Sequence, residues 1–449
     1  MTHDRGIALA VQAAAVEEPA PDAGPTVLHD CADAEAYVAS VCFKHGPPRL
    51  TGVELEWLVH DLAVPGAPVP AARLAAALGA HAPTTLDPRS PALLLPGGSD
   101  VSVEPGGQVE LASPPLPDLA ALLSTVRADT AVLHRLLAAQ GLHPVPRAAD
   151  PLRPPSRVLD VPRYRAMEQA FDRVGPHGRS AMCSTAAVQV SLDAGEGSDI
   201  ARRWAAVHAF GPTLLAAFAN SPVLHGRRTG WKSSRWVSWM RADPERTGPP
   251  PRSAGAGADS SGVDPAAAWA RRVVQSPVLC VRREGAWTVP EHVTFADWIR
   301  GALPGRPTTA DLDYHVSTLF PPVRPHGHLE VRYADAQPGR RWALPTAVLV
   351  ALLHDPAVTD RAREVCEPAE DRWVAAARHG LADRVLARSA AALFELAVTQ
   401  LPAVAAPAWV TEDLIAMTEQ QVLRGRCPAD DPVPASEPDE PAIPEDVIA

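Results

Sequence analysis

The sequence predicts an α+β protein with a mostly antiparallel sheet, helices packed outside it and a helical C-terminal portion. Three observations lead to this prediction. Segments with strand-like alternation are interspersed with helical segments as far as Arg332. The triplet Pro105-Gly106-Gly107 lies between two strand-like arms and indicates a hairpin turn. Beyond Arg332 the pattern is mostly helical.

The expected strands alternate with a period of two, so each has a polar and an apolar face. In residues 50–60, Glu54 and Glu56 share one face and the apolar residues between them occupy the other. Residues 101–112 form the predicted hairpin. In residues 185–193, one face holds Thr185, Gln189, Ser191 and Asp193, and the other holds Ala186, Val188, Val190 and Leu192.

The expected helices have amphipathic or strongly apolar patterns. The longest early helix, 116–140, should end at Gly141, a residue that commonly follows the last helical turn. The full set of expected helices is 71–78, 116–140, 162–174, 200–219, 265–274, 344–353, 357–367, 371–379 and 382–400.

The 449 residues could form two or three domains by length alone. The only strong break is the proline- and glycine-rich stretch 244–264, which we expect to be a mobile surface loop. Strand motifs lie on both sides of it, so it need not divide domains. Residues 1–25 and the acidic, proline-rich residues 428–449 should be disordered, which leaves a single domain at 26–427.

The charge and cysteine patterns exclude several classes of protein. Seven of the eleven excess negative charges lie in the last 20 residues, so the folded body is only mildly acidic and no nucleic-acid partner is expected. The six cysteines are scattered without a CxxC pair, which is typical of free thiols in a reducing cytosol. The sequence contains no run of about 18 or more apolar residues, so no membrane span is predicted and we expect a cytoplasmic protein.

Carboxylates occur where strands are usually apolar. Glu54 and Glu56 would repel each other on one strand face unless water or a cation separates them. Glu104 and Glu110 flank the predicted turn, so pairing of its two arms would bring their carboxylates together. Taken alone, neither pair establishes a binding site: Glu54 and Glu56 could lie on a solvated sheet face, and Glu104 and Glu110 on an exposed hairpin.

A third carboxylate motif lies near the end of the strand-rich part. Glu330 and Arg332 share a face opposite Leu329 and Val331. They could form a surface ion pair of little energetic value. In a phosphate site, the carboxylate would instead hold a metal and the guanidinium would clamp an anion. Together the five separated glutamates indicate a magnesium–nucleotide site, because Mg²⁺ prefers oxygen ligands shared with phosphates.

Other polar residues are ambiguous. Gln189 and Thr185 offer neutral hydrogen bonds, although a plain polar outer face is the simpler interpretation. Residues 227–241 interleave basic and aromatic side chains, as a nucleic-acid surface would. The charge of the body favours instead a loop that presents Arg235 to a small anionic substrate. Cys183 has no base beside it in the sequence and is interpreted as a small buried residue.

No GxxxxGK[ST] loop and no GxGxxG after a strand is present, so bound ATP would depend on metals and arginines. Several strings nevertheless resemble one known family, the bacterial and plant glutamate–cysteine ligases, and in particular their actinobacterial branch in ergothioneine biosynthesis. In order along about 290 residues, the strings are GVELEW at 52–57, VSVEPGGQVELAS at 101–113, MCSTAAVQVSLD at 182–193, FANSP at 218–222 and HVSTLFPPVRPHGHLEVRYADAQP at 315–338.

The resemblance implies a glutamine-synthetase-like fold, in which a curved antiparallel sheet forms a funnel with helices outside. It also implies an ATP-dependent ligase. ATP would phosphorylate the γ-carboxylate of L-glutamate, and the amine of L-cysteine would attack the γ-glutamyl phosphate. The products would be γ-glutamylcysteine, ADP and phosphate.

The resemblance also suggests roles for individual residues. Arg332 matches an arginine beside the transferred phosphoryl group, and Arg235 matches one near a substrate carboxylate. Gln189 stands where some relatives have histidine, and Thr185 is a similar, weaker substrate-binding candidate. The cysteine pocket could be walled by Trp231, Trp236 and Trp239, and the 244–264 loop could cover it. The proposed Mg²⁺ ligands are Glu54, Glu56, Glu104, Glu110 and Glu330.

Three other functions stay open at this point. The chain could join glutamate to a different amine, or be a non-catalytic relative that binds nucleotide. The presence of all five glutamates and both arginines argues against the second. A nucleic-acid-binding module would depend on residues 227–241 alone. The expected partners are therefore L-glutamate, L-cysteine and ATP, and the protein should be a monomer or a weak homo-oligomer.

Overall fold

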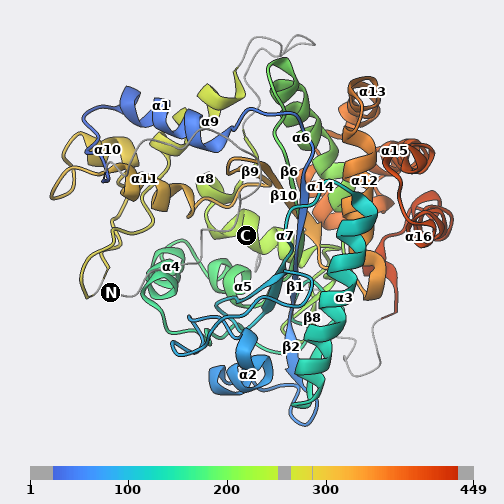
Figure 1. The fold of residues 1–449 in the computed structure, drawn as a ribbon, viewed down its shortest axis with the longest axis horizontal. Helices are drawn as coiled ribbons and strands as arrows, with labels where there is room; N and C mark the ends of the chain where they lie inside the picture. Colours follow the sequence, from blue (N-terminus) through green and yellow to red (C-terminus); the bar gives the residue numbers. More distant parts are fainter. Residues whose placement is uncertain (1–23, 251–263, 286, 433–449) are drawn as a thin grey trace.

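A six-stranded sheet runs through the centre of the molecule (Figure 1). The computed structural model describes residues 24–250, 264–285 and 287–432. The strands follow the order β3-β4-β1-β6-β10-β9, and every neighbouring pair is antiparallel. Their bounds are β1 Thr51–Trp57, β3 Asp100–Val103, β4 Val109–Ala112, β6 Ala187–Leu192, β9 Val323–Pro325 and β10 Leu329–Asp335.

Two short ribbons and sixteen α-helices complete the described part of the chain. The ribbons pair β2 Val59–Asp61 with β5 Leu142–Pro144, and β7 Val223–Leu224 with β8 Arg227–Arg228. The helices are α1 Cys31–Cys42, α2 Ala71–Leu78, α3 Leu119–Ala138, α4 Pro162–Asp172, α5 His177–Cys183, α6 Ser198–Phe218, α7 Ser234–Ala242, α8 Pro244–Thr247, α9 Pro265–Gln275, α10 Phe295–Ile299, α11 Thr309–Val316, α12 Ala343–Leu353, α13 Pro356–Cys366, α14 Trp373–His379, α15 Arg384–Gln400 and α16 Ala408–Gln420.

The apolar face of the sheet is covered by α3, α6 and α12 (Figure 1). Val53, Leu55, Val190 and Val331 point to this face and are each about 1% exposed. α12 is apolar on nearly all sides because it lies between the sheet and the outer helices α13, α15 and α16. This stack of sheet and two helical layers forms the main hydrophobic core.

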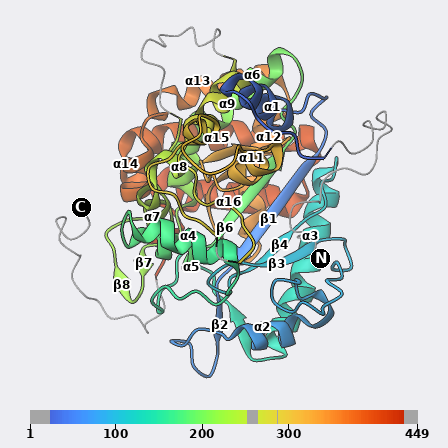
Figure 2. The same ribbon diagram turned by 90° about the vertical axis from the view of Figure 1, so that its left-hand side faces the viewer.

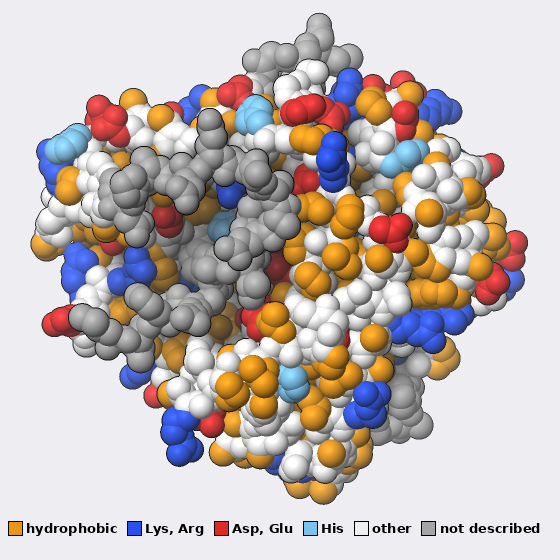
Figure 3. Space-filling view, viewed as in Figure 1, with side chains coloured by type: hydrophobic (Ala, Val, Ile, Leu, Met, Phe, Trp, Pro, Cys, Tyr) orange, Lys and Arg blue, Asp and Glu red, His pale blue; other side chains and the backbone are white. Residues whose placement is uncertain are grey.

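A second group of helices stands across from the polar face. Figure 2 shows α4, α5, α7, α8 and α11 gathered on this side of the sheet. Of these, α4, α5 and α11 share a smaller core of their own, built around Met167, Phe171, Met182, Cys183 and Tyr314. The polar face therefore lies between the two halves of the molecule. Figure 3 shows a hollow on this face, with acidic and basic side chains in its walls.

The α+β prediction is confirmed, and most predicted elements are present within a few residues of their expected bounds. The helix predicted at 71–78 is α2, and the hairpin predicted at 101–112 is the β3–β4 pair. No single helix among the described residues is long and apolar enough to cross a membrane. One pair, Gly339–Leu353 with Pro356–Ala369, passes that test together but is bent by 114°.

The prediction of a mobile loop at 244–264 is wrong for its first residues. Pro244–Thr247 form α8, which Asp243 caps and Pro244 starts, as proline does at a first helical position. Arg246 is 2% exposed and donates from Nη1 to Thr318 and from Nη2 to the carbonyl of Pro277. Residues 251–263 lie outside the described part of the chain.

The predicted disordered tail also begins later than residue 428. Pro428–Asp430 form a short 3₁₀ helix in which Pro428 and Ala429 are buried. Ala429 N–H donates to the carbonyl of Ala219 at 2.9 Å, and Asp430 forms an ion pair with Lys232. The tail prediction for residues 433–449 and the N-terminal prediction for residues 1–23 lie outside the described residues.

Candidate active site

The register of the sheet brings four of the five glutamates to one face. Glu56 on β1 lies directly opposite Glu110 on β4, and Glu54 lies opposite Gln189 on β6. Glu330 on β10 lies opposite Ser191, also on β6. Because strand side chains alternate, all of these point to the face away from α6 and α12.

The turn between β3 and β4 brings in Glu104. Its backbone N–H donates to the carbonyl of Gln108, and its carbonyl accepts from the N–H of Gly107, at the base of the turn. The Gln108 side chain donates to the carbonyls of Met182 and Thr185, which fixes the turn against the start of β6. A Cβ on Gly106 would lie 2.2 Å from the carbonyl oxygen of Cys183, so only glycine permits this approach. The Glu-Pro-Gly-Gly-Gln string thus positions a carboxylate.

Within the described residues, four of these carboxylates form no ion pair that would compensate their burial. Desolvation raises the pKa of Glu54 to about 8, and the charge of Glu330 adds to the rise. Desolvation and then the charge of Glu56 raise the pKa of Glu104 to about 7. Burial likewise raises the pKa of Glu56, and burial with the neighbouring glutamates raises that of Glu110 well above its usual range. A site of this kind favours either bound protons or bound cations.

Glu330 differs from the other four because two arginines hold it. Arg324 donates to both of its oxygens, at 2.6 Å and 3.0 Å, and Arg332 forms a further ion pair with it. These guanidinium groups keep the pKa of Glu330 well below its usual range despite burial. Glu330 and Arg332 share a strand face, as predicted, and the ion pair considered as the alternative is present but buried.

Arg324 was not predicted as a site residue. It lies opposite Glu330 because the chain reverses at Gly327, whose φ is +77°. Gly327, three residues after Arg324 and three before Glu330, is the only sequence signal for this reversal, and it is weak. The pairing becomes evident only when the register of β9 and β10 is known.

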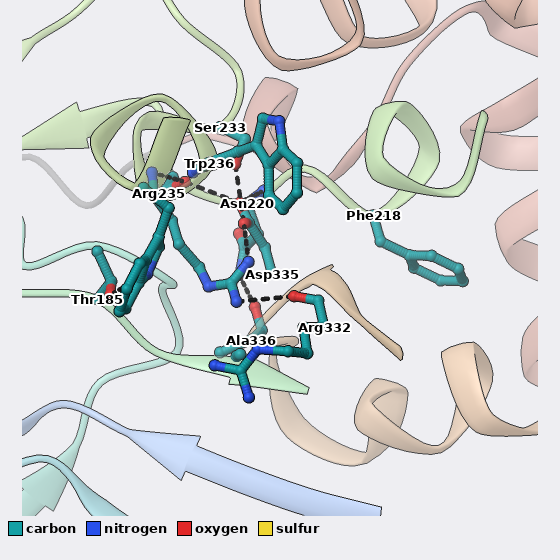
Figure 4. Close-up of polar contacts among 12 residues, drawn as sticks. Thr185, Phe218, Asn220, Ser233, Arg235, Trp236, Arg332, Asp335 and Ala336 are labelled. Carbon is teal, nitrogen blue, oxygen red and sulfur yellow. Dashed lines mark hydrogen bonds and ion pairs between the residues drawn. The ribbon is translucent and has the colours of Figure 1, made fainter. Parts of the chain in front are cut away.

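Arg235 is buried, and the structure corrects its expected place in a loop. It lies in the first turn of α7, whose N-terminus is capped by the Ser233 hydroxyl. Its Nη2 donates to the Arg332 carbonyl at 2.8 Å, which joins the two predicted catalytic arginines (Figure 4). Its Nε and Nη1 have no hydrogen-bond partner among the described residues. Burial lowers its pKa.

The predicted substrate residues Gln189 and Thr185 both lie at this face. Gln189 donates from Nε2 to Glu56 at 2.8 Å, while its Oε1 has no partner among the described residues. Thr185 donates to the carbonyl of Ala181 and accepts from the indole of Trp239 at 3.2 Å. Thus Gln189 lies inside the carboxylate cluster, and Thr185 connects its edge to α7.

The three predicted tryptophans are in different surroundings. Trp239 packs against Phe320 at 5.2 Å, and the Arg332 guanidinium lies 6.0 Å from the Phe320 ring. Trp236 instead stacks on Trp373 in the main core. The ring contacts of Trp231 in the described structure are with two arginines outside the cluster, Arg241 and Arg378. The structure therefore brings Trp239 to the site and does not bring Trp231 or Trp236 into contact with the glutamates.

The chemistry of the donor set fits Mg²⁺ held together with phosphates. Carboxylate oxygens are the ligands that Mg²⁺ prefers, and the clustered charges need a cation. Within the described residues, no three His, Cys, Asp or Glu side chains form a complete metal site on their own. This agrees with the habit of Mg²⁺ to take only one or two protein carboxylates and fill its shell with water and substrate phosphates.

Cys183 takes no part in this chemistry. It is 7% exposed, and burial raises the pKa of its thiol to about 12. It packs in the small core below the β3–β4 turn, as expected for a buried small residue. All six cysteines are free thiols, as predicted.

Comparison with known proteins places the chain in a family. Residues 50–448 match the model of glutamate-cysteine ligase family 2. The chain belongs to this family. It is 41% identical over 434 residues to glutamate–cysteine ligase EgtA of Mycobacterium tuberculosis, with 94% of each chain covered. It is 40% identical to EgtA of Mycolicibacterium smegmatis, with 91% of this chain and 92% of the relative covered.

One solved structure is also similar to this ligase. A glutamate–cysteine ligase from Francisella tularensis in complex with AMP covers 86% of this chain and 84% of its own, with 13% identity and a TM-score of 0.49. The family membership rests on the sequence comparisons, and the α+β architecture rests on the sheet described above.

Proposed function

We propose that this ligase joins the γ-carboxylate of L-glutamate to the amine of L-cysteine and converts ATP to ADP and phosphate. The observation that carries the proposal is the polar sheet face, where four uncompensated glutamates lie beside three arginines. In a family of glutamate–cysteine ligases, this arrangement fits a triphosphate with its metal ions next to an acidic amino acid.

The two ends of the polar face have opposite charge. Glu104, Glu110 and Glu56 lie toward β3 and β4, while Arg324 and Arg332 lie toward β9 and β10. Mg²⁺ ions would be held by Glu54, Glu56, Glu104, Glu110 and Glu330, each ion by only one or two of these carboxylates, and they would neutralise the phosphate charge. The arginines at the other end would face the transferred phosphoryl group and the acceptor carboxylate. Phosphoryl transfer depends mainly on such positioning and charge neutralisation.

Arg332 is the residue we assign to the phosphoryl group. Its guanidinium is fixed by Glu330 on one side and lies over Phe320 on the other. The β10–β6 register shifts between Val331 and Ala334, and this irregularity lies at Arg332. A bulge next to a site re-aims the side chain there. The residue is therefore held in one orientation before substrate binds.

Arg235 and Gln189 are the residues we assign to L-glutamate. Among the described residues, Nε and Nη1 of Arg235 and Oε1 of Gln189 have no hydrogen-bond partner. A buried donor without a partner costs about 1–3 kcal/mol, which a substrate carboxylate would recover. Oε1 of Gln189 would accept from the α-ammonium group.

The reaction balances in two steps. The γ-carboxylate oxygen attacks the terminal phosphorus of ATP, which gives γ-glutamyl phosphate and ADP. The neutral amine of L-cysteine then attacks the acyl carbon, phosphate leaves with the bonding electrons, and the amine proton is lost to solvent or phosphate. The Trp239–Phe320 pair, with Trp231 as a second candidate, would form the wall that selects the side chain of the amine. Thr185 would orient Trp239 through its hydroxyl.

The test is ADP release with ATP, Mg²⁺ and L-glutamate, with and without L-cysteine, followed by the mass of the product. Cysteine-dependent release with a γ-glutamylcysteine mass is the expected result. Release that depends on another amine would move the protein to the wider group of carboxylate–amine ligases. Absence of turnover with every amine, together with tight nucleotide binding, would contradict the enzymatic proposal.

We also propose a place for the reaction. The buried free thiols fit a reducing cytoplasm. The relatives named EgtA and the resemblance described above support a role in supplying γ-glutamylcysteine for ergothioneine biosynthesis. A deletion strain that loses ergothioneine, and regains it on addition of γ-glutamylcysteine, would be the supporting result.

A further inference from the structure

A buried carboxylate outside the glutamate cluster, Asp335, has no role in the reaction described so far. It is the last residue of β10 and is 0% exposed, and both of its carboxylate oxygens already accept hydrogen bonds from the protein. Its Oδ2 accepts from the backbone N–H of Asn220 at 2.8 Å and from the Ser221 hydroxyl at 2.7 Å. Its Oδ1 accepts from the Ser233 hydroxyl at 2.8 Å. A charge buried this completely persists only with such partners.

Ser221 and Ser233 connect Asp335 to the start of α7 through hydrogen bonds. The Ser233 oxygen accepts from the N–H of Trp236 at 3.1 Å, which is the helix cap. The Ser221 oxygen accepts from the N–H of Arg235 at 3.2 Å. A hydroxyl has one proton to donate, and in both serines Asp335 receives it. Both oxygen atoms are thereby oriented with their lone pairs toward the helix amides.

Asp335 also acts on the Arg235 side chain directly. Its Oδ1 lies 3.7 Å from Arg235 Nη1, close enough for an ion pair but too far for a hydrogen bond. The same guanidinium donates from Nη2 to the carbonyl of Arg332, three residues earlier on the same strand. Figure 4 shows these contacts converging on Asp335 from α7 and from the segment at Asn220. The backbone and the guanidinium of Arg235 are therefore both held in place by residues of one strand, β10.

We propose that Asp335 is the positioning residue for Arg235. It fixes the first turn of α7 through two serine hydroxyls and attracts the guanidinium by charge, so that Arg235 and Arg332 keep one relation to the carboxylate cluster. Nε and Nη1 of Arg235, which make no hydrogen bond among the described residues, are then available to the substrate. The inference depends on the proposed role of Arg235 in binding L-glutamate, and it deepens that role.

The main test is Asp335→Asn, which keeps the shape and removes the charge. The expected result is a rise of roughly 10- to 100-fold in both KM and calorimetric Kd for L-glutamate, because small misplacements of a positioning group cost about that much. The KM for ATP should change less than threefold, since Asp335 acts on Arg235 and not on the metal-binding glutamates. Direct binding is measured beside KM so that the result does not depend on turnover.

The matched control is Asp129→Asn in α3. Asp129 is also 0% exposed and accepts from the backbone N–H groups of Gly97 and Ser99 at 2.7 Å and 3.1 Å. It lies apart from the polar face. This variant should lower the thermal unfolding midpoint and leave the KM for L-glutamate unchanged. If both variants lose stability and neither changes glutamate binding, Asp335 is a structural residue and the proposal is wrong.

A double-mutant cycle separates action through Arg235 from any independent effect. Arg235→Lys alone should weaken glutamate binding, and adding Asp335→Asn should weaken it little further. Full additivity would overturn the proposal.

If Asp335→Asn does not fold, Ser233→Ala serves as a second variant, because it keeps the Asp335 charge and removes one of its hydrogen bonds to the start of α7. It should raise the Kd for L-glutamate several-fold, and an unchanged Kd would overturn the proposal. A wild-type protein that binds L-glutamate but forms no product would contradict the proposed ligase activity and leave the role of Asp335 in glutamate binding intact.

Discussion

The two faces of the central sheet are built from the same strands and differ in what they contribute. On β1, Val53 and Leu55 are 1% exposed against the α3–α6–α12 layer, while Glu54 and Glu56 point to the opposite, polar face. The apolar face stabilises the fold through burial. The polar face gathers like charges that oppose folding until cations or substrates compensate them.

This difference shows how an enzyme can separate stability from chemistry at the level of alternate residues. The period of two lets one strand serve a core and a site without either interfering with the other. The polar face itself is graded. Glu330 has two arginine partners, whereas Glu54, Glu104 and Glu110 form no ion pair with any described residue, so the anionic end of the face is where a cation has most to compensate.

Glu54→Gln should have the largest effect. Loss of one metal-binding carboxylate should lower kcat by about 100-fold or more. The free energy of unfolding in metal-free buffer at pH 7 should not fall, because the raised pKa of about 8 keeps Glu54 mostly protonated and a neutral amide then replaces a neutral carboxyl group. Both quantities are measured on the same preparation. Near-wild-type turnover would show that Glu54 is not a ligand of the reacting complex.

Leu55→Ala, one residue away on the opposite face, should do the reverse. Truncating this 1%-exposed side chain should cost about 2–5 kcal/mol of unfolding free energy, measured by denaturant titration. The kcat of the folded fraction should stay within about twofold of wild type. A large loss of kcat with little loss of stability would mean that the two faces are not independent.

Arg324→Lys should separate charge from geometry at the cationic end. Lysine keeps the positive charge but cannot donate to both oxygens of Glu330 as Arg324 does. We expect kcat to fall by roughly tenfold, with KM for L-glutamate little changed. An unaltered kcat would mean that any cation beside Glu330 suffices.

The stability of the wild-type protein should depend on pH through the glutamate cluster. The pKa of Glu54 is about 8 in the folded state against 4.5 as its ordinary value, so the folded state binds more protons between these values. The stability from this group is complete below the lower value and is lost as pH rises through the higher one. Unfolding free energy, measured without divalent cations, should fall relative to Glu54→Gln from about pH 5 to about pH 8. An unchanged difference would contradict the raised pKa.

Trp239→Phe should give the smallest change. It removes the indole N–H that donates to the Thr185 hydroxyl, and the smaller ring makes less contact with Phe320. The KM for L-cysteine should rise by no more than about tenfold, and more than in Trp231→Phe. Equal effects of the two substitutions would restore Trp231 to the acceptor wall.

Much of the fold follows from local patterns that tertiary contacts did not override. Alternation predicted the polar faces of β1 and β6, and the glycine pair predicted the β3–β4 turn. The first residues of the supposed loop, Pro244–Thr247, became helical because Asp243 caps them and because Arg246 finds distant carbonyl partners. Such long-range partners leave no local pattern.

The site was predictable where one strand or turn holds both residues, as with Glu54 and Glu56 or Glu330 and Arg332. It was not predictable where pairing depends on register or on elements far apart in the chain. Arg324 reaches Glu330 only through the β9–β10 reversal, and Asp335 meets Ser233 across 102 residues. Arg235 was expected in a loop because the cap at Ser233 lies inside a glycine-, basic- and serine-rich stretch.

The most direct test of the account is calorimetric binding of a non-hydrolysable ATP analogue with Mg²⁺ at pH 7, in buffers of different ionisation enthalpy. Carboxylates with raised pKa values must lose their protons when they bind a metal. The wild-type protein should bind the analogue tightly only with Mg²⁺ and should release protons, and Glu54→Gln should release fewer. Equal binding in EDTA, or binding without proton release, would contradict the claim that this face is a magnesium–nucleotide site.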